Sequence, residues 1–402
     1  MNSRSTHLTE YAIKHIIADE FTSWQSINPS KIQITRLAGL TNITYKVETQ
    51  EEILPKTIVF REFGNAEGFV DSKQERIVFK TISDLELGPK QLQCGDIWRM
   101  EEFVTNGVHP TNEKMGSSLF QFKSMGVLQK FHQMEIPIPN NGTSLILTKT
   151  LSKNMKNNVI KKIEKRELFT DVELKQLENI EQFLNNDEEF KYLQEMIQKE
   201  NNEELKFCHN DLNQLNIFST TKKDKEIVFI DFEYCSYNYP SYDIANFLNE
   251  SAINYQYEDE PYYVLVDENF DTAPIQAHFL ALCYLIHQIC QENEIHQIIS
   301  LITQKTNKNK DELNTFISLI KQQVLIQRMN EKQINEFFQS VSYLKRRIRR
   351  LQMISNLNWV WWSVLLAHEK NSLNFEYIDY GFLRFKMFER LLELEKARQI
   401  VE

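Results

Sequence analysis

One short polar segment constrains this chain more than any other feature. It runs from His209 to Asn216, reads H-x-D-x-x-x-x-N, and is bordered by apolar residues. The next apolar run, Glu226–Asp231, has the pattern of a short strand and ends in a carboxylate. The fold is therefore expected to bring a polar loop and the end of a strand together at one site.

The residue types at that site suit phosphoryl transfer. This chemistry needs a base at the acceptor hydroxyl, and it needs oxygen ligands for the Mg²⁺ that is bound to the nucleotide phosphates. Asp211 is the candidate base, and His209 is expected to brace the loop by hydrogen bonds. Asn216 and Asp231 are the candidate metal ligands. A polar turn followed by an ordinary strand end would explain the loop motif alone, and Asp231 at the right separation favours the catalytic interpretation.

Outside this segment, the chain divides into a β-rich first part and a helical second part. The first part predicts three strands, a helix and two more strands: Lys31–Leu37, Asn42–Thr49, Lys56–Glu62, Asp71–Leu85, Lys90–Cys94 and Asp96–Val104. The rest is mainly helical, and includes a capping box at Thr170–Glu173. We expect a bilobal α+β fold of the protein-kinase kind, with an N-terminal ATP-clamping lobe at 1–105 and a catalytic and substrate-binding lobe at 106–402.

A nucleotide clamp should lie in the first lobe. The turn between the first two strands stands where a phosphate-covering loop belongs, and its candidate ligands are Gly39, Thr41 and Asn42. Arg61 lies near the end of the third strand, where kinases place a phosphate-pairing lysine. Glu75 on the following helix is its expected ion-pair partner. An ordinary hairpin and a surface Arg–Glu pair are the simpler explanation when each is taken alone.

The strand that ends at Val104 is expected to face adenine through its backbone groups. Its candidate nucleotide-binding residues are Met100, Glu101 and Glu102.

Aromatic residues gather late in the chain. Trp359 and Trp362 are three positions apart and share a face of a helix, and Tyr377 and Tyr380 follow them. Core packing is the commoner role of such a stripe. The alternative is a cage that binds a quaternary ammonium group by cation–π attraction, completed by Tyr255 and by the carboxylate of Glu250.

Composition narrows the class of protein. The net charge of -10 argues against a nucleic-acid partner, which would require excess basic residues. Five cysteines without a CxxC pair indicate reduced thiols, and no apolar run is long enough to span a membrane. We therefore expect a cytoplasmic protein without stable membrane insertion. The basic run 345–350 is expected to be a solvated helix face, with an anionic membrane surface as the minor alternative.

Several motifs resemble the choline/ethanolamine kinase family. They are LAGLTN at Leu37–Asn42, LGPK at Leu87–Lys90, FCHNDLNQLNI at Phe207–Ile217, IDFEYCSYNYPSYDIANFLNE at Ile230–Glu250, and WVWWSVLLA and EYIDY in the last fifth. The resemblance covers most of the chain. It implies ATP- and Mg²⁺-dependent phosphorylation of choline or ethanolamine, on the route to phosphatidylcholine or phosphatidylethanolamine, by an enzyme that is commonly a homodimer.

The resemblance also implies roles for single residues. Asp211 is the base, Asn216 and Asp231 bind Mg²⁺, and Arg61 contacts phosphate with Glu75 as its partner. The amino-alcohol pocket is formed by Glu250, Tyr255, Trp359, Trp362, Tyr377 and Tyr380.

This sequence departs from the family pattern at a few positions. Asn213, which we assign to the substrate site, replaces a glutamine, Leu215 replaces a common glycine, and Ser251 stands where choline kinases often have tryptophan. The segment 288–350 looks longer than usual. Leu248–Glu250 is closer to the ethanolamine pattern, but the full aromatic set favours choline. A catalytically inactive ligand-binding member and an antibiotic phosphotransferase are the other hypotheses.

Overall fold

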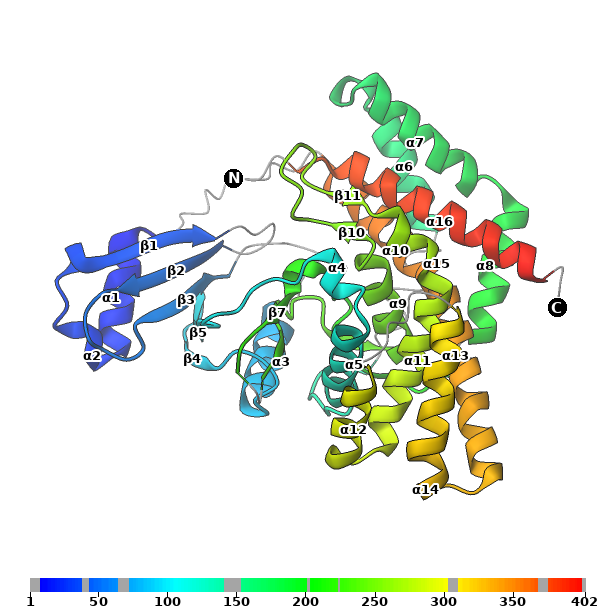
Figure 1. The fold of residues 1–402 in the computed structure, drawn as a ribbon. Helices are drawn as coiled ribbons and strands as arrows, with labels where there is room; N and C mark the ends of the chain where they lie inside the picture. The colour runs from blue at the N-terminus through cyan, green and yellow to red at the C-terminus, as the bar shows by residue number, and fades with distance from the viewer. Residues whose placement is uncertain are drawn as a thin grey trace.

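The computed structural model describes residues 8–37, 43–63, 72–140, 153–200, 203–222, 225–302, 310–367 and 375–399. Figure 1 shows a small β-rich lobe beside a larger helical one. This arrangement confirms the predicted bilobal fold. The division at residue 105 remains a prediction, although the last strand of the small lobe ends at Glu102 and the next helix begins at Asn112.

The small lobe is built on a five-stranded antiparallel sheet in the order β1-β2-β3-β5-β4. The strands are β1 Ile32–Leu37, β2 Ile43–Thr49, β3 Thr57–Glu62, β4 Gln91–Cys94 and β5 Trp98–Glu102. One face packs on α1 (Glu10–Glu20) and α2 (Thr22–Gln25), in a core that includes Ile13, Trp24, Phe60 and Met100. Alternation along β3 and β5 sends Arg61, Arg99 and Glu101 to the opposite face.

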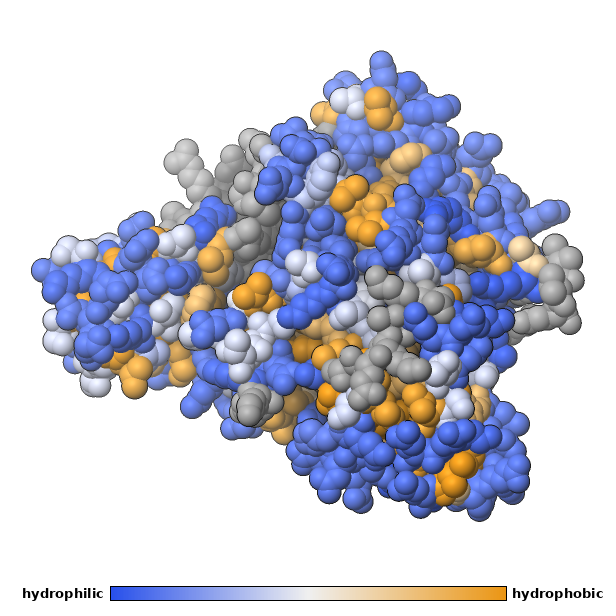
Figure 2. All heavy atoms as spheres, viewed as in Figure 1, coloured by the Kyte–Doolittle hydropathy of each residue, from blue (hydrophilic) through white to orange (hydrophobic). Residues whose placement is uncertain are grey.

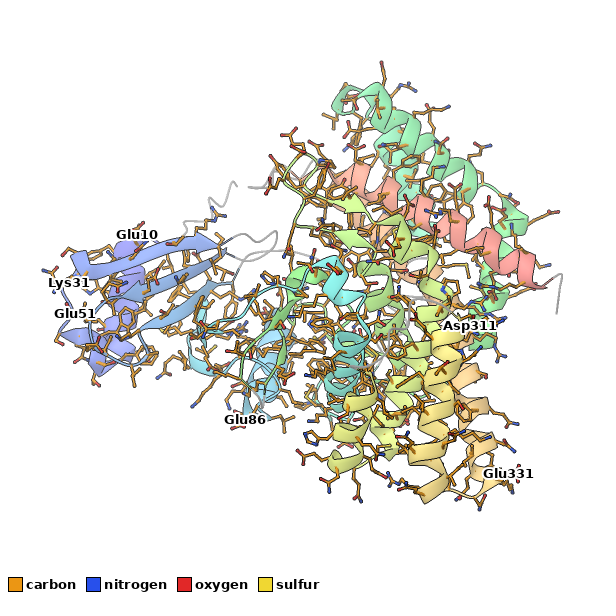
Figure 3. The ribbon with its side chains drawn as sticks, viewed as in Figure 1. Glu10, Lys31, Glu51, Glu86, Asp311 and Glu331 are labelled. Carbon is orange, nitrogen blue, oxygen red and sulfur yellow. The ribbon has the colours of Figure 1, made fainter. Side chains whose placement is uncertain are left out.

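The outer end of this sheet is polar. Lys31 and Glu51 form an ion pair there, and Glu10 begins α1 nearby (Figure 3). At the other end of the lobe, α3 (Ser72–Asp84) stops just before Glu86, which has a left-handed φ of 58°. Figure 3 shows Glu86 at the tip beneath α3.

The large lobe is mainly helical. Its longer helices are α5 Ser118–His132, α6 Lys153–Glu164, α7 Asp171–Leu184, α8 Asp187–Glu200, α9 Pro240–Glu250, α11 Ala273–Ile289, α12 Glu292–Ile302, α13 Lys310–Ile320, α15 Glu331–Leu366 and α16 Tyr377–Gln399. Short helices are α4 Asn112–Met115, α10 Asp267–Asp271 and α14 Ile326–Arg328. Every residue of α9 is buried, because α11 and α15 both pack against it. The predicted capping box forms at Thr170 and Glu173.

Two small β-ladders interrupt the helices and frame the polar segment. β6 (Lys206–Cys208) pairs with β9 (Ser236–Asn238), and β7 (Ile217–Ser219) pairs with β8 (Ile227–Phe229). A third ladder joins β10 (Ile253–Asn254) to β11 (Val264–Leu265). The strand predicted over Glu226–Asp231 is shorter than expected, and Asp231 lies just beyond its end.

The basic run on α15 is not the solvated face we expected. Arg347 is fully buried and pairs with Glu203 at 3.0 Å, while Arg349 and Arg350 both bind Glu395. These arginines therefore hold α15 to its neighbours. Among the described helices, none combines the length and the apolar character that crossing a bilayer requires. The surface in Figure 2 is largely hydrophilic, with separate apolar spots.

Candidate active site

A buried carboxylate on α9 holds the backbone of the polar loop. The backbone N–H groups of His209 and Asn210 donate to the two oxygens of Asp243, at 2.7 Å and 2.6 Å. Asn210 has a φ of 68°, a left-handed conformation that asparagine tolerates better than most residues. Its side-chain amide is held in turn by the carbonyl of Tyr234 at 2.9 Å and by Asn238 at 2.8 Å. The backbone entering the loop is therefore fixed from both sides.

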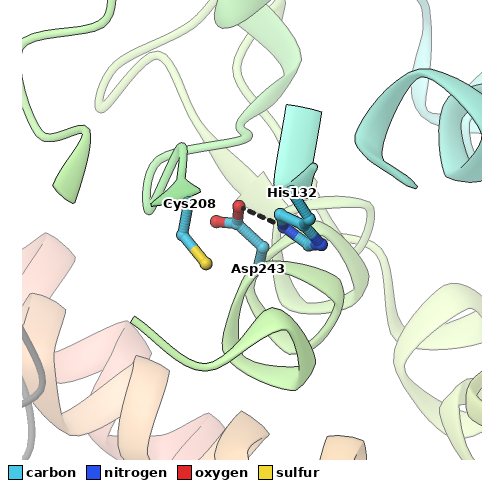
Figure 4. A group of neighbouring side chains, drawn as sticks. All are labelled: His132, Cys208 and Asp243. Carbon is cyan, nitrogen blue, oxygen red and sulfur yellow. Dashed lines mark hydrogen bonds and ion pairs between the residues drawn. The ribbon is translucent and has the colours of Figure 1, made fainter. Parts of the chain in front are cut away.

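A buried histidine supports the same carboxylate. His132 Nε2 lies 3.0 Å from Asp243 Oδ2, and its Nδ1 lies 2.8 Å from the Tyr284 hydroxyl. Figure 4 shows this pair with the Cys208 thiol beside it. These three side chains are of metal-binding types, but both Asp243 oxygens already accept backbone N–H groups. Burial raises the pKa of the Cys208 thiol well above its ordinary value, so the group is a hydrogen-bonded support with a neutral thiol.

The candidate base Asp211 is held by two side-chain amides. Asn213 Nδ2 donates to Oδ1 at 3.0 Å, and Asn216 Nδ2 donates to Oδ2 at 2.8 Å. Burial raises the pKa of Asp211 well above its usual range, and the nearby charges of Glu250 and Asp231 add to the rise. The two amide hydrogen bonds act in the opposite direction but do not cancel it. Asp211 is thus oriented and made more basic than a solvated carboxylate.

The candidate metal ligands lie next to this base. The amide nitrogen of Asn216 is used by Asp211, so the oxygen of the side chain is its remaining group for a ligand. Asp231 has a φ of 62°, and its Oδ1 is buried without a hydrogen-bond partner. A buried carboxylate oxygen that accepts no hydrogen bond and the side-chain oxygen of an amide are ligand types that fit Mg²⁺, which prefers oxygen ligands. His209 Nε2 lies 3.0 Å from the carbonyl of Ile230, so His209 braces Asp231 as well as the loop.

The expected Arg61–Glu75 partnership is corrected by the structure. Arg61 Nε binds Glu101 Oε1 at 3.0 Å, and its Nη1 lies 3.5 Å from Asp231 Oδ1. Glu75 binds Arg99 instead, at 3.1 Å. The reason lies in the sheet, where Arg99 is paired with Arg61 across β3 and β5 and stands between it and α3. Arg61 nevertheless lies within 3.5 Å of the candidate metal ligand Asp231, and its contact with phosphate stays a prediction.

The other nucleotide residues are distributed unevenly. Met100 lies in the core against α1, so only its backbone can face adenine. The Glu101 side chain is taken by the two arginines, and Glu102 is partly exposed, 3.7 Å from Lys222. Gly39, Thr41 and Asn42 lie outside the described residues.

The predicted substrate residues Glu250, Tyr255 and Tyr380 meet in one buried cluster. The Tyr255 hydroxyl donates to Glu250 Oε2 at 2.6 Å and lies 2.8 Å from the Tyr380 hydroxyl. Arg384 donates to the other Glu250 oxygen at 2.6 Å. The Tyr255 N–H also donates to Gln214 Oε1 at 2.9 Å, which links this cluster directly to the polar loop 209–216.

The predicted tryptophans and Tyr377 extend the cluster. The Trp362 ring lies 5.5 Å from that of Trp359 and 5.4 Å from that of Tyr377, both edge to face. Trp362 Nε1 donates to the Tyr234 hydroxyl at 3.0 Å. Trp362 is also 6.3 Å from Tyr380, so all the predicted aromatic residues belong to one continuous set.

Sequence reasoning missed the residues that support this site. They are His132, Asp243, Gln214, Tyr234, Arg99 and Arg384. Asp243, Tyr234 and Gln214 lie inside the quoted motifs, where a buried acid three residues into a helix was a usable signal. His132, Arg99 and Arg384 come from other elements, and their partners follow only from the tertiary fold.

The comparisons with known proteins establish the family of the chain. The choline/ethanolamine kinase family model matches residues 34–389. The chain belongs to the choline/ethanolamine kinase family. Among curated members of this family, it is 22% identical over 375 residues to choline/ethanolamine kinase of Rattus norvegicus, covering 91% of this chain and 82% of that one. It is 23% identical to a probable ethanolamine kinase of Arabidopsis thaliana, over 94% of this chain and 84% of that protein.

Solved structures of choline/ethanolamine kinases share the fold. Choline kinase from Cryptosporidium parvum superposes with a TM-score of 0.69 at 20% identity, covering 98% of each chain. The ethanolamine kinase of Plasmodium vivax gives a TM-score of 0.59 at 19% identity, over 95% of this chain and 89% of that one. Neighbours named for either substrate thus share this architecture.

Proposed function

We propose that this protein transfers the γ-phosphate of ATP to choline, with Mg²⁺ bound by Asn216 and Asp231. The observation that best supports the proposal is the hydrogen bond from the Tyr255 N–H to Gln214 Oε1, because it links the loop that contains the oriented carboxylate of Asp211 to the aromatic cluster. A hydroxyl presented to Asp211 would therefore belong to a molecule whose other end reaches Glu250 and the aromatic rings. Choline has this form.

The chain's own groups suit each part of the transfer. Asp211 accepts the hydroxyl proton of choline as the oxygen attacks the γ-phosphorus, the bond from that phosphorus to the β,γ-bridging oxygen breaks, and ADP leaves; the raised pKa of Asp211 favours its role as the base. Bound Mg²⁺ would neutralise charge on the phosphates. Arg61 faces Asp231 and is available to the same phosphates. Asn213 orients Asp211, which makes it a positioning group beside the acceptor.

The state of Glu250 supports choline over ethanolamine. Both of its oxygens are engaged, one by Arg384 and one by Tyr255. A primary ammonium group needs oxygen acceptors, whereas a trimethylammonium group has no N–H to donate and binds aromatic faces. Trp359, Trp362 and the tyrosines offer such faces. Ethanolamine is the second candidate, because a carboxylate oxygen can accept more than one hydrogen bond.

The test is a direct comparison of acceptors. The purified protein is incubated with Mg-ATP and choline or ethanolamine, and kcat/KM is measured for each. We expect a higher kcat/KM for choline. A higher kcat/KM for ethanolamine would make the protein an ethanolamine kinase instead. A higher kcat/KM for an aminoglycoside would contradict the proposed amino-alcohol kinase activity. If the protein binds choline but consumes no ATP with any of these acceptors, it is a catalytically inactive member of the family.

We also propose that the protein works as a cytoplasmic homodimer in the synthesis of phosphatidylcholine. The family resemblance supports this, and light scattering of the purified protein tests the dimer.

A further inference from the structure

Four charged side chains form a buried ion-pair chain between α3 and the candidate metal site. In order they are Glu75, Arg99, Glu101 and Arg61. The side chains of Glu75 and Arg99 are almost wholly inaccessible, and that of Arg61 is 11% exposed. Asp231 lies at the far end, 3.5 Å from Arg61. A chain of charges therefore runs from a helix of the small lobe to a group expected to hold the metal.

The sheet register explains why a carboxylate is needed in the middle. Arg61 and Arg99 are directly opposite each other on β3 and β5, an arrangement in which like charges repel. Glu101 is two residues along from Arg99 and so projects from the same face. Its Oε1 accepts from Arg61 Nε at 3.0 Å, from Arg99 Nε at 2.9 Å and from Arg99 Nη2 at 2.8 Å. One oxygen thus separates and orients two guanidinium groups.

The remaining contacts fix Arg99 rather than Arg61. The Arg99 guanidinium lies 3.6 Å from the centre of the Phe79 ring on α3, in addition to its bond to Glu75. Among the described residues, Arg61 donates its Nε–H to Glu101 at 3.0 Å, while its Nη1 lies 3.5 Å from Asp231 Oδ1 in the site. The direction of Arg61 consequently depends on Glu101.

We propose that Glu101 is the positioning residue that directs Arg61 toward the phosphates of Mg-ATP, and that Glu75 contributes only indirectly through Arg99. This rests on the proposed use of ATP. It differs from the expectation of a direct pair between the strand arginine and the helix glutamate. Glu101 acts here through its side chain, without touching the nucleotide.

The charge states agree with this arrangement. Burial by itself would lower the pKa of Arg61, but Glu101, followed by Asp231 and then Glu75, raises it overall. Burial would raise the pKa of Glu101, and the two arginines lower it instead. The pair is therefore fully ionised, and Glu101 has the largest share of the attraction on Arg61.

The experiment compares three glutamate-to-glutamine variants. Glu101→Gln and Glu75→Gln test the two possible partners. Glu48→Gln on β2 is the matched control, because Glu48 forms a partly exposed pair with Lys46 in the same sheet. Mg-ATP binding is measured by calorimetry, and KM for ATP and for choline by steady-state kinetics.

We expect Glu101→Gln to weaken Mg-ATP binding and raise KM for ATP by about tenfold, the loss of one charge-assisted hydrogen bond. KM for choline should change less than about twofold. Glu75→Gln should have a smaller effect on ATP than Glu101→Gln, and Glu48→Gln none. Glu101→Asp, which keeps the charge but shortens the side chain, should fold and still show weakened ATP binding.

Two results would overturn the proposal. One is a lower melting temperature in Glu101→Gln and Glu101→Asp with unchanged affinity for Mg-ATP, which would mean a purely structural role. The other is Glu75→Gln weakening ATP binding as much as Glu101→Gln. If the wild-type protein binds Mg-ATP but phosphorylates neither amino alcohol, the proposed function fails, and the calorimetric comparison still decides the role of Glu101.

Discussion

Asp211, the proposed base, is a residue whose burial is costly to the fold. It is buried, and the carboxylates of Glu250 and Asp231 lie close enough to disfavour its charge. The hydrogen bonds from the amides of Asn213 and Asn216 act in the opposite direction. The raised pKa means that the folded protein holds the proton more tightly than the unfolded chain. Ionising Asp211 therefore costs stability as the pH rises through that pKa.

The first prediction is that Asp211→Asn removes turnover and leaves the nucleotide site intact. An amide cannot take the hydroxyl proton, so kcat should fall by a factor of about 10²–10⁴. Affinity for Mg-ATP, measured by calorimetry, should stay within about threefold. Asn213→Ala is the companion variant: it removes one orienting hydrogen bond and should lower kcat less. Wild-type turnover in Asp211→Asn would exclude this residue as the base.

The second prediction concerns pH. Asp211 must be ionised to act as a base, so kcat/KM for choline should rise with pH along an acid limb. The limb should lie above the ordinary aspartate value of about 4, because the pKa is raised. In Glu250→Gln the limb should move to lower pH, since a nearby negative charge is gone. A pH profile of kcat/KM for both proteins measures this. A limb that stays in place would assign the titration to another group.

At the scale of elements, the buried pair of Glu250 and Arg384 joins α9 to α16. Arg384 is fully buried, and two of its nitrogens have no hydrogen-bond partner among the described residues. Its guanidinium also lies 5.9 Å from the Trp359 ring and 5.7 Å from the Tyr380 ring. The helices that line the aromatic cluster are thus held together by a charge inside it.

The third prediction follows from that pair. Arg384→Met leaves the Glu250 carboxylate buried without a counter-charge and should destabilise the protein by about 3–5 kcal/mol. Arg390→Met, on the same helix, breaks exposed pairs with Asp267 and Asp271 and should cost less than about 1 kcal/mol. Urea unfolding of both variants measures the difference. Adding Glu250→Gln to Arg384→Met should restore part of the loss, and no recovery would mean that packing dominates.

The elements show why some parts of the site could be predicted and others could not. Asp211, Asn216 and Asp231 belong to local patterns, in which residue type and spacing carry the chemistry. The helical spacing of Trp359 and Trp362 likewise predicted their contact. The partner of Arg61 depends on the register of β3 against β5. The sequence alone does not reveal which residue of a neighbouring strand lies opposite Arg61. The burial of Arg347 was missed for the same reason, since Glu203 is distant along the chain.

At the scale of the whole molecule, the boundary between the two apolar cores does not coincide with the boundary between the two lobes along the sequence. The sheet of the small lobe has its own core with α1 and α2. Helix α3 lies within the same stretch of chain, yet Val78, Phe79 and Ile82 belong to the core of the large lobe. The Phe79 ring lies 5.7 Å from that of Phe232, just after Asp231. Gln74 also donates to the carbonyl of Cys235 at 3.2 Å.

The fourth prediction is that the fragment 1–105 folds only in part. Without the large lobe, Val78, Phe79 and Ile82 of α3 lose the apolar core in which they are buried, and the contacts of α3 with Arg99 remain. Hydrogen exchange should show protected amides in the sheet and rapid exchange over Ser72–Asp84, whereas the full chain protects both. Equal protection of α3 in the fragment would show that the sheet alone holds it.

This division of the core has a consequence for recombination between relatives. Consider a chimera that takes its small lobe from one relative and its large lobe from another. Its α3 would pack against the side chains around Phe232 of a different protein, and the two apolar faces would not be matched to each other. The ion pairs of Arg99 and Glu101 would at the same time stay matched to α3. Exchange of nucleotide-binding lobes within this family should therefore succeed when Phe232 and its neighbours travel with α3. The residues that must be exchanged together thus come from two stretches that are distant along the chain and in contact in the fold.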